Sequence, residues 1–591
     1  MRAIARLVFL FAISSLSGAL ARGDDGVIVS VKDSDPIIPM PKTAPSFAPG
    51  LLDLWLVALD RPEVEMRTSA ATAIASAHRR GMPGLAIAID PLRKALDRTD
   101  QHPDVRLAAG TALVALNAKA TADSLLKASE AGAEFRELTY PALARWDHPP
   151  ARAVWLGVLD KPLPSTRSHL LAVRALGAVR EANAIPKLRE LLFANEATAP
   201  LRIEIARALA AISPAGLEAD ARRCTADPLA AVTLLRHHRG DEAVRLLQGY
   251  AASDEAGVAG VAVERLLEID PKLALPGLSK VLANSEPETR RLGVEVMVRF
   301  PVVEHIGTLS KLLADTHPLV RNGARRALQG YAGSAALRSA VQVQLIKTLD
   351  LADWRGQEQA ALLAGQLKHK PAAEKLVELL ASQRPEVFTA AAWALREIAV
   401  AESLPAAHEH LKAKHKQLLA SGRSAGMANV TPEQLDQQLS QLVQFIGQAK
   451  YKPADATLRA LIPRTVASAL PPGLTPVGGE TRSAAVWSLG QLHSDTGDEE
   501  LAQAILRRLT GDGTLGPDDA RVRKMAPVAL ALMKATATVP TLREYSQGEK
   551  PTLDAATNAC RWAVAQLEQK PPPPPGVVAI PQTDWFLVPR K

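Results

Sequence analysis

A short histidine cluster, His408-Glu409-His410, holds the residue types best suited to metal chemistry in this sequence. Imidazole and carboxylate groups are common ligands of transition metals. On a helix, however, residues two positions apart point to different faces, so His408 and His410 cannot share one ion. A zinc-protease helix would carry a second histidine at position 412, where this chain has lysine. The sequence therefore predicts no metal site, and His410 takes the position that Leu191 and Val281 fill in similar segments.

Other signatures of catalysis or cofactor binding are missing from the sequence. It has no phosphate-binding Walker loop, no GxSxG nucleophile motif, no GxGxxG fingerprint after a strand and no haem-attachment motif. His237 and His238 lie between two arginines, a cluster typical of a solvated helix C-terminus. Cys224 and Cys560 lie outside any CxxC pattern, so we interpret them as small packing residues. We expect neither catalytic residues nor a cofactor.

Two groups of residues could bind a partner. Three tryptophans take an equivalent position in three similar segments, where they either pack in the core or line a shallow surface for a peptide: Trp393, Trp487 and Trp562. Four basic residues either bind an acidic polymer or form a solvated helix face: Lys412, Lys414, Lys416 and Arg423.

An arginine also recurs near the start of many predicted helices, at Arg106, Arg202, Arg290, Arg321, Arg482 and Arg523. A row of arginines can hold a nucleic-acid backbone. Arginine at this position also pairs with the preceding turn, and the row alternates with glutamate and aspartate. The net charge of +8, from 70 Lys and Arg against 62 Asp and Glu, is small for 591 residues. We therefore expect no nucleic-acid partner.

These residues lie in a two-helix unit that recurs roughly every 30 to 40 residues. Its second helix begins at a polar, acidic or proline-containing turn and continues as Ala-x-x-Ala-Leu, as in HPDVRLAAGTALVAL from His102. Its first helix has proline near the start and leucine at helical spacing, as in IPKLRELL from Ile185. About fourteen second helices can be counted. Because one pair cannot bury its apolar stripe alone, the units must stack.

These motifs resemble the HEAT repeat family, particularly the bacterial phycobilisome-lyase-like HEAT repeats. The resemblance covers about Leu51 to Leu567 and implies an all-α fold, a right-handed α-solenoid of about fourteen two-helix HEAT-type repeats. A hydrophobic content of 47% with only 4% aromatics agrees with thin helices rich in alanine and leucine. The resemblance also implies an alternative function, that of an enzyme or enzyme accessory of the chromophore-lyase type.

The repeats divide the chain as follows: a signal peptide (1–21), an extended or disordered N-terminal arm (22–50), HEAT-type repeats (51–403), one or more irregular or lengthened units (404–479), HEAT-type repeats (480–569), and a proline-rich spacer with a C-terminal tail (570–591). The signal peptide has basic residues, an apolar stretch and a small-x-small site ending at Ala21. In the irregular part, Thr431, Pro432 and Gln434 predict a capping box.

Both termini leave alternatives open. The N-terminal arm, with a strand-like run VIVSV from Val27, either lies over the first repeats or is disordered. The C-terminal tail, with Trp585 and Phe586, either caps the terminal repeat or docks a partner.

The sequence thus predicts an exported, periplasmic or extracellular protein without a membrane span after signal cleavage. Its expected function is that of a non-catalytic scaffold or adaptor that binds a protein or peptide on the concave face lined by the second helices.

Overall fold

The computed structural model describes residues 27–162, 166–255, 257–421, 430–464, 475–511, 517–546, 548 and 550–589. Over these residues the chain forms thirty α-helices, several short 3-10 helices and two strands. The all-α fold predicted from the repeats is confirmed. No helix among the described residues combines the length and the apolar character needed to cross a membrane.

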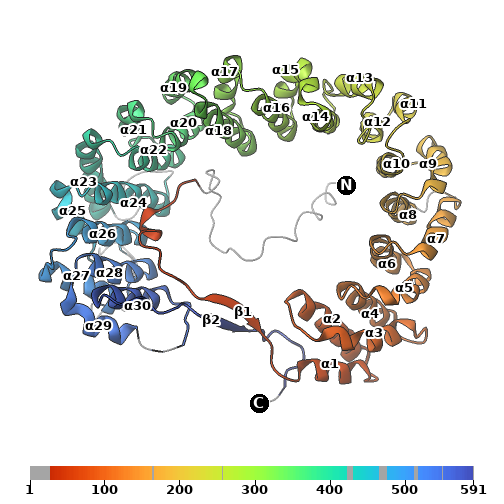
Figure 1. Ribbon diagram of the computed structural model, residues 1–591, viewed down its shortest axis with the longest axis horizontal. Coiled ribbons are helices and arrows are strands. Elements are labelled where there is room, and N and C mark those ends of the chain that lie inside the picture. Colours follow the sequence, from red (N-terminus) through yellow and green to blue (C-terminus); the bar gives the residue numbers. More distant parts are fainter. Residues whose placement is uncertain are drawn as a thin grey trace. The chain divides into compact units, whose positions relative to one another are not determined.

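The helices form consecutive pairs, and within each of the two compact units odd-numbered helices make one layer and even-numbered helices the other (Figure 1). The first helices of the pairs are α1 (Leu51–Leu59), α3 (Ile89–Asp97), α5 (Ala122–Ala128), α7 (Pro149–Leu159), α9 (Ile185–Leu192), α11 (Glu218–Arg223), α13 (Asp241–Tyr250), α15 (Leu278–Ala283), α17 (Val303–Leu312), α19 (Ala335–Leu349), α21 (Ala373–Leu379), α23 (Leu404–Ser421), α25 (Asp455–Leu461), α27 (Glu499–Thr510) and α29 (Val539–Tyr545). The second helices are α2 (Val64–Arg79), α4 (Pro103–Ala115), α6 (Ala133–Arg145), α8 (Thr166–Ala178), α10 (Ala199–Ile212), α12 (Pro228–Leu234), α14 (Val258–Ile269), α16 (Pro287–Arg299), α18 (Pro318–Gly333), α20 (Trp354–Gln366), α22 (Pro385–Ile398), α24 (Pro432–Gln448), α26 (Gly479–Leu492), α28 (Ala520–Leu532) and α30 (Ala555–Leu567).

Small residues allow the second helices to approach closely. A Cβ atom added at Gly177 in α8 would lie 2.9 Å from the Cα atom of Ala208 in α10. The same addition at Gly490 in α26 would lie 2.7 Å from the Cα atom of Ala529 in α28. Both distances are shorter than a carbon–carbon contact, so only glycine fits there.

The recurring arginines hold the pairs together internally. The side chains of Arg106, Arg202 and Arg321 donate to backbone oxygens at or just beyond the end of the preceding first helix, those of Leu96, Ala194 and Asp315. Arginine suits that place because the last carbonyls of a helix lack partners and attract positive charge. Arg482 instead forms a buried ion pair with Asp518, 2.7 Å apart. In these repeats the arginine row has a structural role.

The chain divides into two compact units, which are described separately. The N-terminal unit contains Lys42–Val296 and Val577–Lys591. In it, β1 (Lys42–Ser46) and β2 (Val577–Pro581) form a parallel two-stranded sheet, with Lys42 opposite Val577 (Figure 1). Beyond β2, the ring of Trp585 packs edge-on against Trp55 of α1, with ring centroids 5.1 Å apart, and the guanidinium of Arg80 lies 4.7 Å from its centroid. The described part of the tail beyond β2 therefore lies on the first repeat, and not on the terminal repeat as one of the two alternatives predicted.

The C-terminal unit contains Met297–Gly576 together with the N-terminal residues up to Pro41. Residues 27–41 run along its second helices from α22 to α30 (Figure 1). The arm is extended, as one alternative predicted, but these residues contact late repeats and not the first ones. The run from Val27 forms no strand: Val31–Asp33 is a 3-10 helix, because its backbone meets helix side chains and not a neighbouring strand.

The region 404–479 contains one complete pair, α23 and α24, and the first helix of the next pair, α25. The capping box is confirmed: Thr431 accepts the backbone N–H of Gln434, and the Gln434 side chain accepts that of Thr431. The helix that it starts, α24, packs between α22 and α26 like any other second helix. The described residues thus hold fifteen pairs, one more than the motif count, because α24 lacks the alanine-rich motif.

Candidate functional site

Three successive second helices each direct one side chain at the backbone of residues 29–35. From α22, Arg396 Nη1 donates to Val29 O at 2.8 Å. From α24, Gln444 Oε1 accepts from Lys32 N at 3.2 Å. From α26, Trp487 Nε1 donates to Asp35 O at 2.7 Å.

These contacts fall three residues apart along the bound segment. The three helices are consecutive in the second-helix layer, and residues 31–33 of the segment form a 3-10 helix between the outer contacts. The segment therefore advances one repeat for each three residues. We call the surface formed by Arg396, Gln444, Glu480, Trp487 and Lys524 the segment site.

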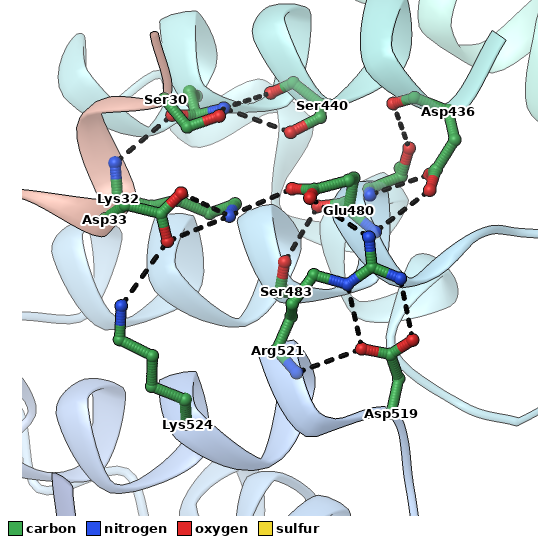
Figure 2. Close-up of polar contacts among 12 residues, drawn as sticks. Ser30, Lys32, Asp33, Asp436, Ser440, Glu480, Ser483, Asp519, Arg521 and Lys524 are labelled. Carbon is green, nitrogen blue, oxygen red and sulfur yellow. Dashed lines mark hydrogen bonds and ion pairs between the residues drawn. The ribbon is translucent and has the colours of Figure 1, made fainter. Parts of the chain in front are cut away.

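The Lys32 side chain is the deepest part of the bound segment, with only 1% of it exposed. Its Nζ lies 3.0 Å from Glu480 Oε2 and 3.3 Å from Asp33 Oδ2. The other oxygen of Glu480, Oε1, accepts from Arg521 Nη1 at 3.0 Å, and Lys524 Nζ lies 3.5 Å from Asp33 Oδ1 (Figure 2). Acidic and basic groups thus alternate across the segment and α26 and α28.

Asp436 of α24 fixes the start of α26 and with it Glu480. Its two carboxylate oxygens accept the backbone N–H groups of Glu480 and Thr481 at 2.9 and 2.8 Å (Figure 2). Burial raises the pKa of Asp436, and these hydrogen bonds oppose the rise. A Cβ atom at Gly478 would lie 2.6 Å from Asp436 Oδ1, so the glycine leaves room for the carboxylate.

Buried polar side chains of α24 form hydrogen bonds that orient the residues of the segment site. Gln438, Gln441 and Gln444 lie three residues apart on α24 and are all buried. Gln441 Oε1 accepts from Arg396 Nη1 at 2.7 Å, and Gln444 Nε2 donates to Ser440 O at 3.0 Å. Burial lowers the pKa of Arg396, while Glu397 beside it raises it. These bonds orient the groups that meet the segment.

The three candidate tryptophans have different surroundings. Trp487 is buried and holds Asp35 O. Trp393 is buried against α20, where a Cβ atom at Gly365 would lie 2.5 Å from its ring. Trp562 is half-buried and lines a cavity of about 180 Å³ with Pro39 and the prolines 572–575. Two of the three therefore lie beside the N-terminal segment, and one lies in the core.

Three of the basic candidates, Lys412, Lys414 and Lys416, lie on α23, a first helix, away from the layer that holds the segment. Lys412 Nζ pairs with Glu409 at 2.9 Å, and Lys416 is exposed. Lys414 is half-buried, and burial lowers its pKa. Arg423 lies outside the described residues.

The histidine cluster separates into two structural contacts. His408 Nε2 lies 2.8 Å from Thr457 Oγ1, and His410 Nε2 lies 3.3 Å from Gln438 Nε2. Within the described part of the chain, no three His, Cys, Asp or Glu side chains gather as metal ligands would. The predicted solvation of His238 is wrong, because its ring is buried against the start of α11, where it accepts the backbone N–H of Leu217 at 3.2 Å.

The two cysteines are buried and free. Burial raises the pKa of Cys224 to about 11 and that of Cys560 to about 12. Both are therefore protonated at neutral pH, whereas thiol chemistry needs the thiolate.

Sequence reasoning missed four of the five residues of the segment site, Arg396, Gln444, Glu480 and Lys524, and also missed Lys32 of the bound segment. The three-residue spacing of the glutamines on α24 was a usable signal, since a polar stripe at helical spacing indicates a face with its own partners. Nothing in the sequence indicated that residues of the N-terminal segment contact this face of α24.

No family model and no curated protein matches the sequence. Among solved structures, the chain is similar to yeast importin-beta (Kap95p), with a TM-score of 0.49 and 13% identity over 87% of this chain and 72% of that one. It is also similar to Kap121p, with a TM-score of 0.48 and 13% identity over 88% of this chain and 56% of that one. The stacked helix pairs described above make the chain an all-α solenoid of the HEAT-repeat type.

Proposed function

We propose that this protein is a non-catalytic scaffold that binds an extended segment of a partner protein on the second helices of its C-terminal unit. One observation carries the proposal: this layer already holds an extended polypeptide, residues 27–41, with one backbone contact from each of three successive helices. Contacts to backbone atoms can be made with many sequences, so the same layer suits other peptides.

The proposal includes export. The signal peptide expected in residues 1–21 would direct the chain out of the cytoplasm and leave Arg22 as the first residue. Cell fractionation followed by N-terminal sequencing tests this step. A mature chain that begins at Met1 in the cytoplasm would contradict it.

The origin in bacteria and the phycobilisome-lyase-like subfamily belong to the same proposal, and so does the absence of catalysis. Purified protein mixed with a bilin should leave the absorbance spectrum of the bilin unchanged. A stable spectral shift would favour the chromophore-lyase alternative.

Photo-crosslinking at two matched glutamines tests where a partner binds. Gln491 of α26 lies in the second-helix layer, where its Nε2 is 3.2 Å from Asp35 Oδ2, whereas Gln503 of α27 is exposed in the first-helix layer. A photoreactive residue is placed at each position of the full chain and irradiated in the exported fraction. We expect adducts at position 491, mapped by mass spectrometry to one continuous segment of a partner. Adducts at position 503 alone, or at neither position, would refute the proposal.

A further inference from the structure

The bound N-terminal segment is held largely by polar contacts. Three of its large apolar side chains are exposed, Val29 by 56%, Ile37 by 75% and Met40 by 41%, and three others, Val27, Ile28 and Val31, are half-buried. Among its large apolar side chains, only Ile38 is fully buried. Apolar burial is the main source of tight association, so this segment opens more readily than the helices beneath it.

The deepest contact of the segment selects lysine. Glu480 has one oxygen engaged by Arg521, which leaves only Oε2 for the incoming cation. An ammonium group binds a single oxygen as a point charge, whereas an incoming guanidinium loses the stronger bidentate geometry when only one oxygen is left for it. The neighbouring Lys524, 3.5 Å from Asp33, favours an acidic residue directly after that lysine.

We propose that the segment site recognises a peptide segment with a single 3-10 turn in which lysine is followed directly by an acidic residue, as in Val31–Asp33, and that residues 29–35 are a resident copy that a partner segment of the same chemistry displaces. This inference rests on the proposed function, since it specifies what kind of segment the scaffold binds. The resident copy lowers the apparent affinity for the partner, because only the open fraction of the protein is competent to bind.

The probe is a fluorescent synthetic peptide that repeats residues 27–41, and the readout is its anisotropy with the full mature chain. Lys32→Met in the chain weakens the resident copy but leaves the segment site intact, since Lys32 belongs to no helix of the repeats. We expect the Lys32→Met chain to bind the peptide at least about tenfold more tightly than the wild-type chain. Lys42→Met, at an exposed lysine of β1, is the matched control and should bind like the wild type.

Two further variants test the chemistry of the site. In the Lys32→Met chain, Glu480→Gln should weaken peptide binding about tenfold. A peptide with arginine in place of its lysine should bind the Lys32→Met chain about tenfold more weakly than the original peptide. Far-UV circular dichroism checks that each variant keeps its helices.

Equal binding to the wild-type and Lys32→Met chains would overturn the proposal, as would equal binding of the lysine and arginine peptides. Failure of the peptide to bind any chain up to about 1 mM would overturn it as well. If partner adducts still form at position 491 in that case, the scaffold function stands and only the lysine–acid recognition falls. If adducts fail and the peptide behaves as expected, the partner proposal falls and the site has only an internal occupant.

Discussion

Substituting alanine for Gly447 tests whether close helix contact stabilises the repeats. In α24, a Cβ atom at Gly447 would lie 2.6 Å from Ser488 Cβ and 2.8 Å from Ser488 Cα of α26. Normal contact needs about 3.5 Å, so the helices must separate by nearly 1 Å or distort. The Ser488 hydroxyl also donates to Val443 O at 2.9 Å, and this bond would be lost or lengthened.

The expected magnitude follows from three contributions. Overpacking of a close-packed interface costs about 1–3 kcal/mol. Loss of the serine hydrogen bond costs about 1 kcal/mol, and the higher helix propensity of alanine returns about 1 kcal/mol. The net effect is a destabilisation of about 1–3 kcal/mol. Gly330→Ala in α18 is the control, because no atom lies within 4 Å of its added Cβ, so it should stabilise by about 1 kcal/mol.

Native-state hydrogen exchange is the suitable assay, since long repeat arrays open locally and not in one global transition. We expect amides of α24 and α26 to exchange about ten to a hundred times faster in Gly447→Ala, and Gly330→Ala to slow exchange in α18. Ser488→Gly should reduce the effect of Gly447→Ala, because it removes the side chain that the new methyl group meets. Unchanged or slower exchange in Gly447→Ala would refute the packing argument.

Three further substitutions test other contacts. Burial lowers the pKa of His410 to about 4, whereas a histidine in the unfolded chain has a pKa near 6.5, so protonation between these values stabilises the unfolded chain. The protection of α23 and α24 amides against hydrogen exchange should therefore decrease as the pH drops from 6.5 to 4. His410→Leu should remove this decrease in protection. Asp518→Asn leaves the buried Arg482 without its charge partner and should destabilise α26 and α28 by about 3–5 kcal/mol, measured by exchange; a loss below about 1 kcal/mol would contradict the buried pair. Trp585→Ala should speed exchange of the β1–β2 ladder without affecting α24, and an unchanged ladder would show that the tryptophan does not hold the tail.

The helix pairs were predictable because each one repeats the same apolar spacing and turn signals. Helix α24 was assigned to an irregular unit and left out of the repeat count because it lacks the alanine-rich motif of the other second helices. Gln438 is buried because its Nε2 donates to Leu380 O at 2.9 Å, a contact 58 residues away in the sequence. Burial of a polar residue depends on such partners, and a local pattern does not contain them.

The segment site could not be predicted either, because its contacts join residues that are more than 350 residues apart in the sequence. In sequence, Lys32 lies in a polar stretch and resembles a solvated residue. It is buried because its backbone meets Gln444, 412 residues later, and its ammonium meets Glu480. The tail was predictable in part. Trp585 indicated a residue that packs against another surface, but no nearby sequence pattern indicated that Trp55 is its partner.

Polar side chains of the segment site have partners other than the bound segment, and these partners bear on how the segment can be released. Without the segment, Arg396 keeps its bonds to Gln441 and Glu397, and Gln444 keeps its bonds to Ser440. Glu480 likewise keeps Arg521. After release of residues 29–35, Arg396, Gln444 and Glu480 therefore still have polar partners, whereas Trp487 Nε1 loses its acceptor, Asp35 O. An unpaired buried charge would make opening costly, so the partners that Arg396 and Glu480 keep favour the exchange of segments that we propose.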